Sequence, residues 1–304
     1  RVLITGATGF KGSWLCLCLE RLGAHIIGYS LEPNTQRDNY VVCGLEKRIT
    51  HIVGDVNDFN QIMSVFEKYN PEIVFHLAAQ PLVIESYKNP LDTYMSNVNG
   101  TFNVLEAVRL TKSVLAGIFI TSDKCYQINN KINNYKETDR LGGNDPYSAS
   151  KAACEIIIHS YIKSFFHSND NAFIASARAG NVIGGGDWSE NRIVPDCIRA
   201  IEAGKPIKLR NPHSTRPWQH VLEPLFGYII LAQKIYSNKQ KNFSGPWNFG
   251  PKRKNHLKVV EFASLFRKKL KSKSKMILNK KPDLREKIFL DLNSSKSTKL
   301  LKWK

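Results

Sequence analysis

The 304-residue sequence lacks any apolar run approaching the roughly 20 residues that a membrane-spanning helix requires. It also opens directly on the apolar run Val2–Thr5, without the basic region and cleavage site of a secretory signal peptide. We therefore expect neither membrane insertion nor secretion. The sequence predicts a cytoplasmic protein.

Paired cysteines are also lacking. Six cysteines are scattered along the chain, and none of them forms a C-x-x-C pair or a metal-ligand spacing. The sequence therefore predicts neither a disulfide framework nor a metal site. Reduced thiols agree with a cytoplasmic compartment.

Acidic residues are outnumbered, with 26 Asp and Glu against 44 Lys and Arg, for a net charge of +18. Such an excess can attract nucleic acid or an anionic membrane surface. Much of the excess lies in the C-terminal third, as in residues 268–275, without the interleaved aromatic residues of an RNA-binding motif. We therefore expect solvated lysines and no nucleic-acid partner. A small anionic substrate agrees equally well with a positive field.

The first half of the chain alternates short β-branched apolar runs with helical patterns. Strands are expected at residues 2–5, 25–30, 49–53, 73–76, 113–121 and 172–178, and helices at 11–22, 59–69, 91–110 and 146–166. Continuous apolar strands separated by helices indicate a parallel sheet covered on both faces. The predicted fold class is α/β, with a doubly wound parallel sheet of the Rossmann type.

The pattern changes after Arg178, where a glycine-rich loop and shorter elements begin. Helices are expected there at 195–202, 223–236, 259–270 and 294–301, and a strand near 288–290. We expect residues 1–178 to form the Rossmann domain, with a segment at about 211–237 returning to it. Residues 179–210 and 238–304 are expected to form a smaller, interleaved substrate lobe.

A glycine-rich turn follows the first strand and opens the first helix. Glycines there allow a tight turn and close approach of the backbone to a pyrophosphate, whose charge the helix N-terminus favours. The context predicts dinucleotide binding. The assigned residues are Gly6, Thr8, Gly9, Phe10, Lys11 and Gly12, with Asp55 and Val56 after the third strand and Leu77, Ala78 and Ala79 after the fourth. The second strand ends without a carboxylate for the adenosine ribose, which leaves NAD and NADP both open.

Tyr147 and Lys151 are four residues apart, so on a helix their side chains share one face. A lysine ammonium near a phenol favours the phenolate, which predicts that Tyr147 acts as an acid and base near neutral pH. Ser122 is expected to share that proton. Asp123 adds a carboxylate that simple alcohol oxidation does not need, so the set indicates sugar oxidation coupled to loss of water. The alternative is a chance pair on an amphipathic helix.

Longer segments resemble the extended short-chain dehydrogenase/reductases, and within them the CDP-glucose 4,6-dehydratases. The matching segments are Thr5–Leu15, His76–Val83, Thr121–Tyr126, Leu141–Lys151, Ser176–Trp188, Arg210–Leu225 and Trp247–Pro251. They cover nearly the whole chain, and the likeness weakens after Pro251. Related dTDP-glucose enzymes usually have Glu after the aspartate, whereas this chain has Lys124, which resembles the CDP-glucose branch.

The resemblance implies NAD that stays bound and is recycled, with CDP-glucose as the substrate. It implies that Tyr147 and Ser122 deprotonate the 4-hydroxyl, that Lys151 holds the nicotinamide ribose, and that Asp123 protonates the departing 6-hydroxyl. Lys124 is the candidate base for the C5 proton. Asn97 is expected to support the active-site helix beside the cofactor, with an ordinary helix-interior amide as the alternative. The expected substrate-binding residues are Gln80, Asn181, Arg192, Arg210, Arg216, His220 and Arg285, although any single arginine could instead form a surface ion pair.

The resemblance also implies a homodimer or a higher homo-oligomer, formed through the helices at 91–110 and 146–166. The product would feed deoxysugar biosynthesis for a surface polysaccharide such as the O-antigen of lipopolysaccharide. The alternatives are another sugar-nucleotide dehydratase, a 4-epimerase, or a non-catalytic NAD-binding protein on the same fold.

Overall fold

Seven parallel strands form the central sheet of the computed structural model, in the order β11-β6-β5-β4-β1-β2-β3. The structure describes residues 1–129, 134–166, 172–238, 241–251, 256–279 and 290–304. The sheet strands are β1 (Val2–Thr5), β2 (Ile26–Ser30), β3 (Thr50–Val53), β4 (Ile73–His76), β5 (Ala116–Ile120), β6 (Phe173–Ala179) and β11 (Gly245–Phe249). The predicted doubly wound Rossmann fold is confirmed.

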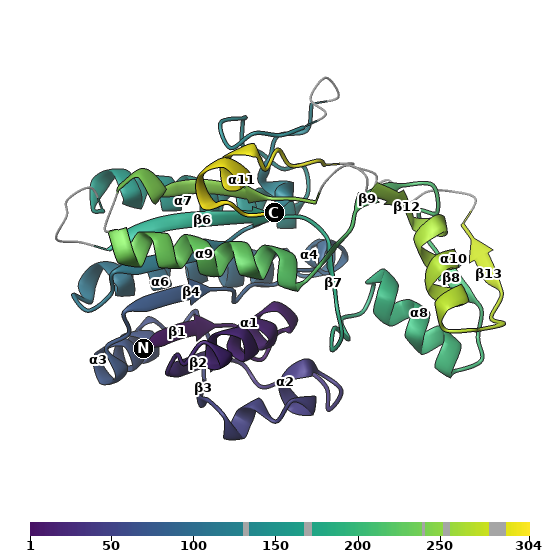
Figure 1. Cartoon of the computed structure of the whole chain (residues 1–304), viewed down its shortest axis with the longest axis horizontal. Coiled ribbons are helices and arrows are strands. Elements are labelled where there is room, and N and C mark those ends of the chain that lie inside the picture. The colour runs from purple at the N-terminus through teal and green to yellow at the C-terminus, as the bar shows by residue number, and fades with distance from the viewer. Residues whose placement is uncertain (130–133, 167–171, 239–240, 252–255, 280–289) are drawn as a thin grey trace.

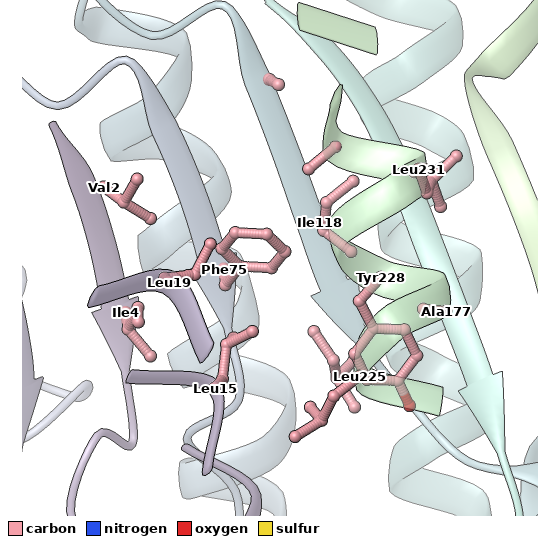
Figure 2. Close-up of a cluster of buried hydrophobic side chains, with 14 of the residues drawn as sticks. Val2, Ile4, Leu15, Leu19, Phe75, Ile118, Ala177, Leu225, Tyr228 and Leu231 are labelled. Atoms are coloured by element: carbon pink, nitrogen blue, oxygen red, sulfur yellow. The ribbon is translucent and has the colours of Figure 1, made fainter. Parts of the chain in front are cut away.

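Helices cover both faces of this sheet (Figure 1). On one face lie α1 (Phe10–Arg21), α9 (Leu222–Asn238) and α11 (Ser295–Leu301). On the other lie α3 (Phe59–Tyr69), α6 (Gly100–Leu110) and α7 (Pro146–Ser164). Figure 2 shows side chains of α1 and α9 packed on those of the strands. Each large apolar side chain buried in this way contributes about 1.5–3 kcal/mol relative to exposure.

A smaller lobe lies to one side of the sheet (Figure 1). It contains α8 (Ile193–Glu202), α10 (Val259–Lys269) and two strand pairs. One pair is β8 (Ile207–Leu209) with β13 (Met276–Leu278), and the other is β9 (Thr215–Pro217) with β12 (His256–Lys258). A separate apolar cluster that includes Cys197, Ile207 and Ala263 forms its core. A two-stranded pair, β7 (Val182–Ile183) with β10 (Gln219–His220), lies at the connection.

The remaining described elements are short. They are α2 (Asn39–Val42), α4 (Val83–Lys88), α5 (Pro90–Tyr94), and the 3₁₀ turns Leu45–Lys47, Asp123–Cys125 and Lys241–Phe243. Between α5 and α6 lies a π-helical segment, Met95–Asn99. The single regular helix expected at 91–110 is therefore wrong in detail, because a π-helical turn interrupts it.

The division into domains also differs from the expected one at β11. Residues 238–304 were assigned to the lobe, but β11 pairs with β6 over five residues and forms the outer strand of the large sheet. The reason is visible in the side chains, since Trp247 and Phe249 are fully buried against α9 and α11. Of the strand expected near 288–290, residues 288 and 289 lie outside the described residues.

Candidate active site

The glycine-rich turn between β1 and α1 lies at the carboxyl edge of the sheet. Gly6 has a φ of +72°, and a Cβ there would lie 2.7 Å from the backbone nitrogen of Ala78. A Cβ at Gly12 would lie 2.0 Å from the carbonyl oxygen of Gly6. Both positions therefore require glycine. This tight turn, followed at once by a helix N-terminus, fits the pyrophosphate of a dinucleotide.

The other predicted cofactor residues follow neighbouring strands, so they lie at the same edge. Thr8, Gly9, Phe10 and Lys11 come after β1, Asp55 and Val56 after β3, and Leu77, Ala78 and Ala79 after β4. The backbone N–H groups of Leu77 and Ala78 both donate to Oγ1 of Thr5, at 3.2 Å each. The carboxylate of Asp55 accepts two hydrogen bonds from Asn57, so the turn partly occupies this predicted adenine contact.

The segment after β5 holds the predicted acid pair. Ser122 is buried, and its hydroxyl donates to Oδ1 of Asp123 at 3.0 Å. The same hydroxyl accepts from the backbone N–H of Lys124 at 3.2 Å, which caps the 3₁₀ turn. Burial raises the pKa of Asp123, while Lys124, Ser122, Arg216 and Lys11 act in the opposite direction. A carboxyl that keeps its proton to higher pH suits a general acid.

Helix α7 presents Tyr147 and Lys151 to the same place. Asp145 caps its N-terminus by accepting from the backbone N–H of Ser148 at 2.9 Å, and Pro146 occupies the first helical position. The backbone N–H of Tyr147 also donates to Oγ of Ser86 in α4 at 3.2 Å. These contacts fix the first turn of the helix, and both functional side chains are buried.

Burial moves the pKa values of both Tyr147 and Lys151 away from their ordinary values. Burial raises the pKa of Tyr147 to about 12, and the hydrogen bond with Ser122 only partly opposes it. Burial also lowers the pKa of Lys151. The hydroxyl of Ser122 and the charge of Arg192 both favour the phenolate here. That Lys151 keeps the phenol acidic stays a prediction.

Three further cations act on these groups. Lys11 interacts with Asp123, and burial together with Arg192 lowers the pKa of Lys11 to about 8. Arg192 also acts on Tyr147, and Arg216 on Asp123. Arg192 is itself held by Asp187 at 2.9 Å. The site therefore collects positive charge from α1, from the start of α8 and from β9, as a diphosphate requires.

Asn97 and Gln80 form a buried support beneath α7. The side-chain oxygen of Asn97 accepts from the backbone N–H of Gln80 at 2.8 Å, and its nitrogen donates to Oγ of Ser150 at 2.8 Å. The Gln80 side chain donates to Thr93 at 2.8 Å and accepts from the backbone of Leu82 at 2.5 Å. The structure thus engages the Gln80 side chain with Thr93 of α5 and with the backbone of its own loop, although it was predicted to bind substrate.

The other predicted substrate residues are dispersed. Asn181 follows Gly180, where a Cβ would lie 3.0 Å from Oδ2 of Asp123, so Asn181 lies near the site. Arg210 is bound to Asn191 at 3.0 and 2.6 Å. His220 lines a cavity of about 850 Å³ whose lining includes none of the predicted catalytic residues. Arg285 lies outside the described residues.

The sequence analysis missed a buried ion pair behind the site. Glu155 of α7 and Arg178 of β6 lie 2.7 Å apart, and each side chain is only 3% exposed. Glu155 is one helical turn beyond Lys151, and Arg178 is the one charged residue in a buried strand. The sequence could have revealed this ion pair, because a charged residue in a strand buried on both faces almost always has a partner of opposite charge.

The parallel sheet, the glycine turn and the Tyr–Lys pair define a Rossmann-type dinucleotide-binding protein. The model of the NAD dependent epimerase/dehydratase family matches residues 2–250. The chain belongs to this family, and its cofactor is NAD.

The chain is similar to CDP-glucose 4,6-dehydratase of Salmonella typhimurium, with 46% identity over 86% of this chain and 74% of that protein. It is 29% identical to dTDP-D-glucose 4,6-dehydratase of Dictyostelium discoideum, over 77% of this chain and 56% of that protein.

Among solved structures, UDP-glucose 4-epimerase of Thermotoga maritima superposes with a TM-score of 0.85 at 21% identity. The comparison covers 100% of this chain and 93% of that one. The dTDP-glucose 4,6-dehydratase of Streptomyces venezuelae, solved with NAD bound, gives 0.82 at 17% identity, over 100% and 91%. These likenesses describe the fold.

Proposed function

We propose that this protein is an NAD-dependent hydro-lyase that converts CDP-glucose into CDP-4-keto-6-deoxyglucose. The observation that carries the proposal is the hydrogen-bonded Ser122–Asp123 pair, which stands beside a Tyr–Lys dehydrogenase pair. A buried carboxyl with a raised pKa is what elimination of a hydroxyl requires. The likeness to the Salmonella enzyme supports the substrate.

The first step is oxidation at C4 of the sugar. Bound NAD, which the glycine turn and Lys151 would hold, would supply the hydride acceptor for C4 and the hydride donor for C6. Tyr147, hydrogen-bonded to Ser122, takes the proton of the 4-hydroxyl, and Lys151 orients the nicotinamide ribose. Removing the proton from the sugar hydroxyl is the chain's contribution to this step, since the hydride leaves only as the C4–O bond gains double-bond character.

The second step is loss of water across C5 and C6. The 4-ketone makes the C5 proton acidic, and Lys124 is the base that removes it. Asp123 donates its proton to the 6-hydroxyl, so that water departs. With the hydride returned to C6 and the proton on Lys124 returned to C5, the net change is loss of one water with no net oxidation.

The substrate lies between the large sheet and the small lobe. Arg192 and Arg216 bind its diphosphate, with Asn181 beside Asp123. Arg192 begins α8 and Arg216 belongs to β9, so both come from lobe segments and act on groups of the sheet domain. This arrangement supports a binding mode in which the reacting sugar lies over Tyr147 and the lobe holds the nucleotide.

The test is to incubate the purified protein and NAD with CDP-, dTDP-, UDP- or GDP-glucose in separate reactions. The mass of each product is then measured. Loss of one water from CDP-glucose alone is expected. Loss of water from another nucleotide sugar would keep the mechanism and change the substrate. An isomer of unchanged mass would indicate a 4-epimerase, and NAD binding without turnover would indicate a non-catalytic protein.

We also propose a homodimer formed through the outer faces of the helices around 91–110 and 146–164. Large apolar side chains are exposed there, at Leu91 (72%), Met95 (41%), Phe102 (43%), Ile156 (59%) and Phe165 (41%). A soluble monomer rarely exposes so many neighbouring apolar groups.

Within the described residues, no helix has the length and apolar character to cross a membrane. We place the enzyme in the cytoplasm, where its product would supply deoxysugar for a surface polysaccharide such as O-antigen.

A further inference from the structure

A buried polar linkage runs behind the active site and joins four segments of the chain. Arg178 of β6 donates to Oε2 of Glu155 at 2.7 Å and to the hydroxyl of Tyr126 at 2.8 Å. Tyr126 in turn donates to Oδ1 of Asn248 in β11 at 2.8 Å. All four side chains are nearly inaccessible.

Both ends of the Ser122–Asp123–Lys124 segment are attached to this linkage. On one side, the hydroxyl of Thr121 donates to Oε1 of Glu155. On the other side, Tyr126 follows the 3₁₀ turn Asp123–Cys125 directly and is held by Arg178. Glu155 belongs to the helix that carries Tyr147 and Lys151. One carboxylate and its arginine therefore connect the acid segment with the dehydrogenase pair.

The direction of each hydrogen bond is fixed by chemistry. Burial acts against the Glu155 carboxylate, but Arg178, Thr121 and Ser176 together hold its pKa below the ordinary value. Burial raises the pKa of Tyr126, so its phenol stays protonated and can donate to Asn248. Asn248 then donates to the carbonyl oxygens of Tyr135 at 2.9 Å and Asn293 at 3.3 Å. A buried network with this many paired groups favours one arrangement of its side chains, although Nε of Arg178 has no hydrogen-bond partner among the described residues.

We infer that Glu155, Arg178 and Tyr126 are positioning residues that hold Asp123 and Lys124 at a fixed place relative to Tyr147. Tyr126 is attached to the acid segment, whereas Tyr147 and Lys151 are held independently by the caps of α7. Loosening the Tyr126 end therefore displaces Asp123 and Lys124 of the elimination step. Ser122 of the oxidation step keeps its hydrogen bond with Tyr147, and its neighbour Thr121 stays bound to Glu155. This inference rests on the proposed dehydratase activity.

The variant to make is Tyr126→Phe, which keeps the ring and removes the hydroxyl that joins Arg178 to Asn248. Product formation is expected to slow by roughly ten- to a hundredfold, since small displacements of catalytic groups have effects of that size. Because oxidation continues while elimination is slowed, reduced nicotinamide is expected to accumulate on the enzyme during turnover. Its absorbance gives a signal that a general loss of folded protein would not produce.

The matched control is Tyr135→Phe. Tyr135 is also buried and packs against Tyr126 with ring centroids 5.0 Å apart, but its hydroxyl contacts the backbone of Asn129 instead of Arg178. It is expected to show no accumulation. Equal behaviour of the two variants would overturn the inference.

A second pair of variants serves if Tyr126→Phe does not fold. Thr121→Val removes the hydroxyl on Glu155 with little change of shape, and Thr121→Ser restores it. Val should slow turnover, and Ser should recover it. An unchanged rate for Val would overturn the inference.

Hydrogen exchange separates this inference from the proposed activity. Amides of residues 121–127 should exchange faster in Tyr126→Phe than in Tyr135→Phe, whether or not the wild-type protein turns over CDP-glucose. A wild-type protein without turnover would refute the proposed function alone. Unchanged exchange would refute the positioning role alone.

Discussion

Asn97 and Ser150 are hydrogen-bonded across two helices, with Nδ2 of Asn97 donating to Oγ of Ser150 at 2.8 Å although 53 residues separate them. Ser150 in turn donates to the carbonyl oxygen of Tyr147 at 2.7 Å. Asn97 is fully buried in the π-helical segment, so its amide is aimed at the helix that carries the site. The irregular turn between α5 and α6 is thus linked through Ser150 to Tyr147, the proposed catalytic tyrosine.

Asn97→Ala should destabilise the protein and reduce kcat. The substitution leaves the backbone N–H of Gln80 without its partner in a buried place, which costs about 1–3 kcal/mol. Urea unfolding measures the loss of stability, and steady-state kinetics should show a larger change in kcat than in KM. Asn99→Ala, in the same π-helical segment but bonded to Asn57, is the control and should affect both quantities less. Equal kcat values for the two variants would contradict the prediction.

Asp123→Asn should separate activity from stability. Without a transferable proton, kcat should fall by about 10²–10⁴-fold. Since the pKa of Asp123 is raised in the folded protein, its ionisation destabilises the fold as pH rises through that pKa. The variant should therefore be more stable than wild type at pH 8, with the difference vanishing below about pH 4. Thermal unfolding across this range tests the sign, and a variant less stable at pH 8 would refute it.

Lys11 should make cofactor binding depend on pH. Its pKa is lowered to about 8, so the ammonium is lost near that pH unless an anion holds it. We expect the Kd for NAD to rise by about tenfold or less between pH 7 and 9 in wild type, since a single charge contact contributes about 1 kcal/mol. Lys11→Arg should remove this dependence, and Lys11→Met should bind weakly at both values. Titration calorimetry measures the constants, and a Lys11→Met variant with the wild-type profile would exclude the role.

Ile156→Glu should prevent the proposed dimer. Ile156 is 59% exposed on the outer face of α7, and a carboxylate there would have to be desolvated in an apolar interface. Light scattering after gel filtration should give the mass of a monomer, which is 34.5 kDa for this chain. Leu265→Glu, at a position 52% exposed on α10 of the small lobe, is the matched control and should leave the mass of the oligomer unchanged. A wild-type protein that runs as a monomer would refute the dimer itself.

The fold was predictable from the sequence because its signals are local. The strands β1, β4 and β5 are short continuous apolar runs, and each is followed by a helical pattern, which only a sheet covered on both faces accommodates. The position of β11 was not predictable in this way. Its pairing with β6 spans about seventy residues of intervening chain, and local composition does not encode such a long-range partner.

The candidate site was predictable as a set of residues, but its electrostatics were not. Ser122, Asp123, Tyr147 and Lys151 follow from residue type and spacing, and the structure brings Ser122 and Tyr147 into contact. The pKa of Tyr147 depends on how deeply the phenol is buried, which spacing alone does not reveal. The engagement of Gln80 by Thr93 and Leu82 likewise depends on tertiary contacts.

Because β11 is an edge strand of the large sheet, its position has a consequence for truncating the protein. The segment 1–178 contains the glycine turn, the acid segment and α7, and so has the content of an autonomous NAD-binding unit. A fragment that ends there, however, would leave β6 as an exposed edge strand. Its backbone hydrogen-bonding groups would then be free to pair with other chains. The apolar surface that Trp247 and Phe249 now cover would be exposed with it. Such a fragment would aggregate, so the first half of this chain depends on its last third for solubility.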